Sequence, residues 1–145
     1  MHHRIRGIAA PFLVAGLVAA CSQAPTPAED HVPPAEVEAV AGSDISRLTL
    51  TERAAERLDI QTAAVAQSAG VANETSIPYS AILYAPDGVT WIYVSPEPLT
   101  YLRELVVVDR IEGEVAVLSG GPAVDTEVVT VGVAELYGTE FEVGH

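Results

Sequence analysis

The stretch IPYSAILYAPDGVTWIYV, residues 77–94, contains the only tryptophan of the chain, three of its five tyrosines and a Pro-Asp-Gly turn. Runs of β-branched and aromatic residues on both sides of such a turn are typical of a β-hairpin. Alternation along the second run places Trp91 and Tyr93 on one face and Ile92 and Val94 on the other. Because both faces are apolar, we expect this run to form a central strand.

The flanking segments extend this hairpin into a small domain that is mainly β. Thr51 is a favourable N-cap residue, and residues 52–58 are expected to form one short helix with Ala54, Ala55 and Leu58 on one side. The fold expected is a small β-barrel or β-sandwich with this one short N-terminal helix. Strands are predicted at 47–50, 60–67, 76–84, 89–95, 99–108, 114–120 and 126–136, with hairpin turns at Pro86-Asp87-Gly88 and Glu112-Gly113.

The first 20 residues are typical of a secretory signal peptide. Arg4 and Arg6 precede an uncharged, mostly apolar run at 8–20, which is shorter than the roughly 20 residues that span a bilayer. Ala19 and Ala20 then precede Cys21, the only cysteine of the chain, a pattern that resembles a bacterial lipobox. We therefore expect Cys21 to be lipidated and the protein to be an extracytoplasmic, membrane-anchored lipoprotein, in the periplasm or at the cell surface. An ordinary signal peptide followed by an unmodified cysteine is the alternative.

Residues 21–43 are rich in Pro, Ala and Glu and are predicted to form a tether between the lipidated cysteine and a folded domain at 44–145. Without Arg4 and Arg6, five arginines remain against 20 acidic residues, and the mature net charge is −15. A chain this acidic is repelled by phosphate backbones, so nucleic acid is not an expected partner.

The residue types that carry catalysis are sparse. Glu52 and Glu56 alternate with arginines on the predicted helix, and Glu112 and Glu114 flank a turn, so both pairs are expected to be solvated charged groups and not the facing carboxylates of a glycosidase. Nucleophilic catalysis needs a base near the nucleophile, and metal sites need clustered ligands. We expect no catalytic residues, metal or cofactor, because the mature chain has two isolated histidines, His31 in the tether and His145.

Five aromatic residues have two interpretations. They could line a groove for a small ligand, which would make the protein a ligand-binding lipoprotein. Large side chains on adjacent strands of a small domain are more often its core and its cross-strand pairs, and we favour that interpretation. The five are Tyr79, Tyr84, Trp91, Tyr93 and Tyr101.

Two parts of the chain resemble periplasmic adaptor subunits, the membrane fusion proteins of resistance-nodulation-division and related efflux pumps. LTLTERAAERLDIQTAAV, residues 48–65, is similar to the opening of these adaptors, and residues 77–94 with 105–136 are similar to their C-terminal part. The second match rests on Ile77, Pro78, Ser80, Ala81, Gly88, Trp91, Tyr93, Val94, Leu118, Ser119, Gly120, Val128, Val129 and Gly132.

The resemblance implies a membrane-proximal β-domain in which the two ends of the adaptor chain meet. It also implies a non-enzymatic role, with an efflux transporter in the membrane as the partner. In adaptors a lipoyl-like domain, a helical hairpin and most of a β-barrel separate the two stretches, whereas about ten residues separate them here. Because the hairpin that docks to the outer-membrane channel is missing, the transporter alone is the expected partner. A degenerate adaptor without an independent function is the other alternative.

Overall fold

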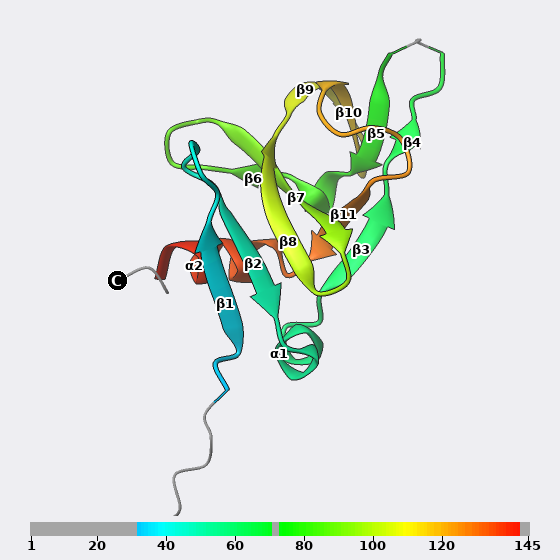
Figure 1. The fold of residues 1–145 in the computed structure, drawn as a ribbon. Coiled ribbons are helices and arrows are strands. Elements are labelled where there is room, and N and C mark those ends of the chain that lie inside the picture. The colour runs from blue at the N-terminus through cyan, green and yellow to red at the C-terminus, as the bar shows by residue number, and fades with distance from the viewer. Residues whose placement is uncertain (1–31, 71–72, 143–145) are drawn as a thin grey trace, which may run out of the picture. The chain divides into compact units, whose positions relative to one another are not determined.

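The computed structural model describes residues 32–70 and 73–142, and these residues are mainly β (Figure 1). The predicted signal peptide at 1–20, the predicted lipidation site Cys21 and the histidines His31 and His145 lie outside the described residues. Two sheets pack as in a β-sandwich without closing into a barrel, so the prediction of a mainly β fold is confirmed.

The seven-stranded sheet has the order β1-β2-β8-β7-β11-β3, with β6 paired to β7 beside this path. Its strands are β1 (Ala35–Ala39), β2 (Ser46–Leu50), β3 (Gln61–Ala64), β6 (Leu83–Tyr84), β7 (Thr90–Glu97), β8 (Thr100–Leu105) and β11 (Glu127–Val131). The four-stranded sheet has the order β4-β5-β10-β9 and contains β4 (Ala66–Gln67), β5 (Thr75–Pro78), β9 (Val107–Glu112) and β10 (Val115–Gly120). Within the described ranges three helical segments accompany the sheets: α1 (Glu52–Arg57), the 3-10 turn η1 (Tyr79–Ala81) and α2 (Val133–Glu142).

Two segments pass directly from one sheet into the other. β3 continues into β4 through Val65, and β8 continues into β9 through Val106. Both valines are buried, and both backbone N–H groups are bonded, Val65 to the carbonyl of Thr126 and Val106 to that of Thr90. The prediction of single strands at 60–67 and 99–108 is therefore wrong, because each segment bends at its valine and serves both sheets.

The seven-stranded sheet has an apolar cluster on each face. Tyr93 and Leu48 lie in the cluster that α1 and α2 cover, together with Leu136 of α2. Ile92 and Val94 lie in the cluster between the two sheets. The predicted alternation along the central strand is thus confirmed, and β7 lies between β8 and β11 as expected.

The local signals around this core are also confirmed. The hydroxyl of Thr51 accepts a hydrogen bond from the N–H of Ala54 and caps α1, and Ala54 is the buried residue of that helix. The Pro-Asp-Gly turn joins β6 to β7, and the side chain of Asp87 accepts a bond from the N–H of Val89. Gly113 has a φ of 64° in the turn between β9 and β10, a conformation that glycine adopts at low cost.

Three other expectations are corrected. The segment 76–84 is not one strand, because η1 separates β5 from β6. The segment 126–136 contains β11 only to Val131, and the chain then forms α2, a second helix. The predicted tether 21–43 extends too far, because Ala35–Ala39 forms β1, which pairs antiparallel with β2.

Gly132 is the residue at which β11 gives way to α2. Its φ is 89°, and a Cβ placed there would collide with the side chain of Ile60. We predict that Gly132→Ala lowers the free energy of unfolding by about 1–3 kcal/mol, because the side chain adds strain and overpacking. Urea denaturation measures the change.

Gly138, inside α2, is the matched control for this substitution. A Cβ built on Gly138 meets no atom within 4 Å. Gly138→Ala should raise the free energy of unfolding by about 0.5–1 kcal/mol through helix propensity. A Gly132→Ala variant as stable as the parent would contradict the described junction.

Candidate functional site

The five aromatic residues do not form one site. Tyr93 and Tyr101 lie in the core on the helix-covered face of the larger sheet. Tyr79 and Tyr84 lie on the surface, 42% and 56% exposed. A hydrogen bond with Tyr79 raises the pKa of Tyr84. The core interpretation therefore holds for Tyr93 and Tyr101 and is wrong for Tyr79 and Tyr84, while Trp91 is half-buried.

A buried polar cluster joins α2 to the larger sheet. Tyr93 donates a hydrogen bond of 2.6 Å to Oε2 of Glu140, and the N–H of Ser46 donates one of 3.2 Å to Oε1. Nε of Arg103 lies 3.2 Å from the same Oε2, and the two side chains are 7% and 2% exposed. The contact is an ion pair and not an aligned hydrogen bond, since the Nε–H of Arg103 has no hydrogen-bond partner in the part of the chain that the structure describes. Glu140 thus connects α2 to β2, β7 and β8.

Aromatic rings enclose the guanidinium of Arg103. Its Cζ lies 4.3 Å from the centre of the Trp91 ring and 5.1 Å from that of Phe141, distances typical of cation–π contacts. Nη2 of Arg103 donates a hydrogen bond of 3.1 Å to the carbonyl of Asp44. Nε1 of Trp91 is buried without a hydrogen-bond partner among the described residues. The cluster is therefore a packed structural site in which Trp91 covers a charged group.

Burial raises the pKa of the Tyr93 hydroxyl well above its ordinary value of 10.0, and the hydrogen bond to Glu140 raises it further. A phenolate beside a buried carboxylate would place two negative charges in contact, so the proton stays on Tyr93. Burial also raises the pKa of Tyr101.

This cluster is not evident from the sequence alone. Arg103 lies two residues after Tyr101 on the same predicted strand, so both side chains share one face. A charged residue on the core-facing side of that strand was therefore the one sequence signal for the cluster. Its partner Glu140 lies beyond the last predicted strand, on a helix that was not predicted. Without α2 no pairing of these two charges could be inferred.

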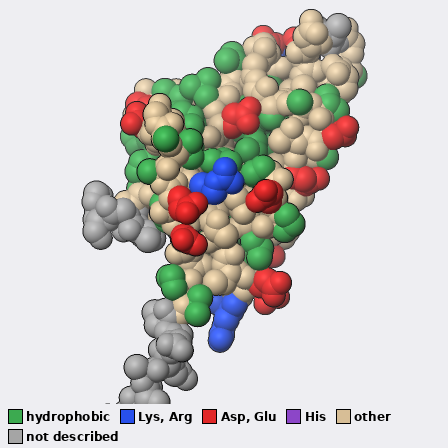
Figure 2. All heavy atoms as spheres, in the orientation of Figure 1, with side chains coloured by type: hydrophobic (Ala, Val, Ile, Leu, Met, Phe, Trp, Pro, Cys, Tyr) green, Lys and Arg blue, Asp and Glu red, His purple; other side chains and the backbone are tan. Residues whose placement is uncertain are grey.

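The acidic pairs considered from the sequence are solvated, as expected. Glu52 and Glu56 are exposed on α1. Oε1 of Glu112 lies 2.6 Å from Nε of Arg110, and Nη1 of the same arginine lies 2.9 Å from Oε2 of Glu74. Acidic side chains are spread over the face seen in Figure 2, where basic ones are few. Among the described residues no His, Cys, Asp and Glu side chains form a group that could hold a metal.

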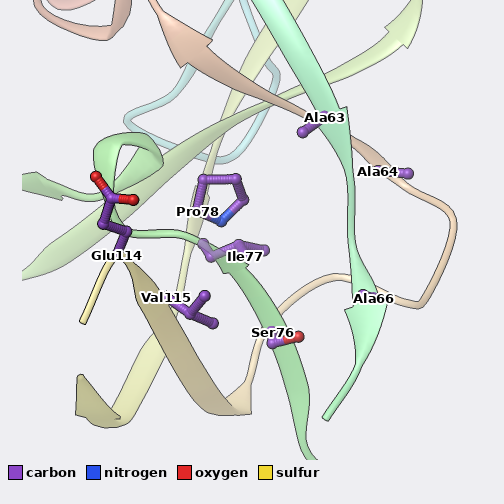
Figure 3. Close-up of a pocket in the computed structure, with 8 residues that line it drawn as sticks. All are labelled: Ala63, Ala64, Ala66, Ser76, Ile77, Pro78, Glu114 and Val115. Atoms are coloured by element: carbon purple, nitrogen blue, oxygen red, sulfur yellow. The ribbon is translucent and has the colours of Figure 1, made fainter. Parts of the chain in front are cut away.

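A groove of about 300 Å³ lies between the β3–β4 segment and β5 (Figure 3). Ala63, Ala64 and Ala66 are spaced along one wall, and Ile77 and Pro78 lie opposite them. The ladder between β4 and β5 has only two residue pairs. The ladder cannot continue through Pro78, because proline has no N–H to donate, and the groove opens at that point.

A second hollow, of about 340 Å³, lies where β1 begins and is bounded by α1 and α2. Its walls are mostly apolar, with Leu50 from β2, Leu58 at the end of α1 and Ala35 from β1. Of the described residues that line it, Arg57 and Thr139 are the ones whose side chains carry polar groups. Separately, no helix in the described ranges has the length and apolar character needed to cross a membrane.

We predict that Glu140→Gln lowers the free energy of unfolding by about 3 kcal/mol, because it leaves the buried charge of Arg103 without its counterion. Urea denaturation near neutral pH measures the loss. The exposed Glu135 on the same helix is the control, and Glu135→Gln should change stability by less than about 0.5 kcal/mol. Equal effects of the two substitutions would contradict the cluster.

We also predict an alkaline loss of stability that depends on Tyr93. The unfolded chain releases this proton near pH 10, whereas the folded chain holds it to higher pH. The contribution is therefore full below about pH 10, and the free energy of unfolding falls as the pH rises above it. Urea denaturation between about pH 8 and pH 11 should show that the free energy of unfolding falls less steeply with pH in Tyr93→Phe than in the parent. The fall that remains in the variant includes the contribution of Tyr101, whose pKa is also raised. Identical slopes for parent and variant would refute this assignment.

Comparison with protein-family models, with curated proteins and with solved structures finds no match to this chain.

Proposed function

We propose that this protein is a lipid-anchored, non-enzymatic, adaptor-like component of an efflux transport system that contacts the extracytoplasmic face of a membrane transporter. The observation that carries the proposal is the pairing of the two stretches that resemble the ends of a periplasmic adaptor. β3, in the first stretch, pairs with β11, in the second, with Thr62 opposite Val129 and Ala63 opposite Val128. Such pairing is what a shared membrane-proximal domain requires.

The short connection between the two stretches supports the same proposal. β4 pairs with β5, and the N–H of Ser68 donates a bond to the carbonyl of Glu74, so the chain turns back within a few residues. The entropy cost of closing a loop grows only slowly with the length of the loop. A domain that carries long insertions in adaptors can therefore persist when a short loop replaces them.

The charge of the domain favours a neutral or basic partner surface. Residues 32–145 contain five arginines and 18 acidic residues, a net charge of −13. Attraction between such a surface and a basic one speeds association and weakens as salt screens it over about 8–10 Å. In this proposal the predicted tether keeps the domain near the membrane while the acidic surface meets the transporter.

A ligand-binding lipoprotein is less well supported. That alternative assigned the ligand to the Tyr/Trp cluster, and two members of the cluster, Tyr93 and Tyr101, are core residues.

We predict that crosslinking in native membranes, followed by capture of this protein, recovers a multi-spanning transporter at low salt and less of it at moderate salt. The control is the Cys21→Ser variant, which cannot take a lipid and should therefore be lost from the membrane fraction. Capture of this variant should recover little transporter. Recovery of no transporter at either salt, or of an outer-membrane channel in its place, would refute the adaptor proposal. A serine variant that partitions to membranes like the parent would refute the anchor.

A further inference from the structure

β1 is the outer strand of the seven-stranded sheet, and in the described ranges its one hydrogen-bonded neighbour is β2 (Figure 1). Two bonds beyond the ends of β1 define which of its backbone groups are used: Thr51 N–H to the carbonyl of Pro34, and Val40 N–H to the carbonyl of Ile45. Since bonding alternates along an antiparallel pair, Glu36 and Glu38 point their backbone groups toward β2. The N–H and C=O groups of Ala35, Val37 and Ala39 therefore point to the open edge.

The two faces of this edge differ in chemistry. Glu36 and Glu38 are exposed and share one face. Ala35 and Val37 lie on the opposite face, where Ala35 is buried and Val37 packs against the helix-covered core. Ala35 also lines the apolar hollow between α1 and α2. A strand added to this edge would place every second side chain beside the two glutamates and the others toward that hollow.

A second copy of this chain does not suit the edge. An antiparallel β1–β1 pair centred on Val37 would place Glu36 of each copy opposite Glu38 of the other, and like charges directly opposite are destabilising. The chain's own residues 22–31 suit it no better. They contain Pro25 and Pro27, which cannot donate to a ladder, and they carry only acidic charge.

We propose that the open edge of β1 binds an extended segment of the partner protein that alternates basic and apolar residues. The segment adds to the sheet as an outer strand, with its N–H and C=O groups bonded to Ala35, Val37 and Ala39. Its basic side chains lie beside Glu36 and Glu38, and its apolar side chains pack toward the hollow. This inference names the docking surface of the proposed adaptor function and, in that respect, rests on it.

The test uses the full-length protein in a zwitterionic detergent and a labelled heptapeptide that alternates Lys and Val. Fluorescence anisotropy should detect binding of this peptide, and salt should weaken it. A peptide with Glu in place of Lys should not bind, and one with Ser in place of Val should bind much more weakly. In amide exchange measured by NMR, the Lys-Val peptide should slow the N–H groups of Ala35, Val37 and Ala39 and leave those of Glu36 and Glu38 unchanged.

Two variants separate strand addition from simple charge attraction. Ala39→Pro removes one outward N–H and no bond to β2, and should weaken binding about five-fold, whereas Ala39→Val should not. Glu36→Lys with Glu38→Lys should weaken binding by about ten-fold or more. The control, Glu97→Lys with Glu127→Lys, makes the same charge change on exposed residues of β7 and β11 and should have little effect.

Thermal unfolding of each variant establishes that it is folded before binding is compared. Uniform protection of amides across the surface, or equal effects of the two double charge reversals, would overturn the inference. So would no binding of the Lys-Val peptide, or protection of the outward amides of β1 before any peptide is added. The peptide experiments test only the docking edge of β1. The proposed adaptor function is tested separately by capture of a transporter from membranes, so the failure of one can be told from the failure of the other.

Discussion

The bends at Val65 and Val106 are the constraint on which the rest of the fold depends. Each valine turns one continuous segment from the larger sheet into the smaller one, and each side chain enters the apolar cluster between the sheets. Since the sheets share two segments, they cannot separate without pulling these valines out of the core. The smaller sheet therefore covers one face of β7, and the helices cover the other.

Both charged and apolar contacts hold α2 against the helix-covered face of the larger sheet. Glu140 brings α2 onto the sheet through Tyr93, Arg103 and the N–H of Ser46. A buried ion pair contributes little net stability compared with apolar residues, although breaking one is costly. We therefore interpret the cluster as a device that orients α2 and one wall of the hollow beside β1, since Thr139 of that wall precedes Glu140 directly.

The parts of the fold that depend on local chemistry could be predicted from the sequence. The Pro-Asp-Gly turn, the Thr51 cap and the alternation along β7 each rest on neighbouring residues. The bends could not be predicted, because valine suits a straight strand as well as a bend, and burial at Val65 depends on distant partners.

The same limit explains the missed α2, the missed β1 and the incomplete description of the site. The run before Gly132 is rich in valine and continues into a helix only because glycine allows the change of direction. β1 is rich in Ala and Glu and follows two prolines, a composition typical of a tether, and its pairing with β2 makes it a strand. The Arg103–Glu140 pair joins β8 to α2 and could not be found without α2.

The two shared segments require that residues 48–65 and 77–136 unfold as one cooperative domain. Native-state amide exchange in increasing denaturant measures this directly at two bonds, from Val65 N–H to the carbonyl of Thr126 and from Val106 N–H to that of Thr90. We expect one opening free energy and one denaturant dependence for both amides, as for a single unfolding unit. Exchange of Val65 at a lower free energy, without dependence on denaturant, would show that the first stretch opens on its own and that the two stretches are not one unit.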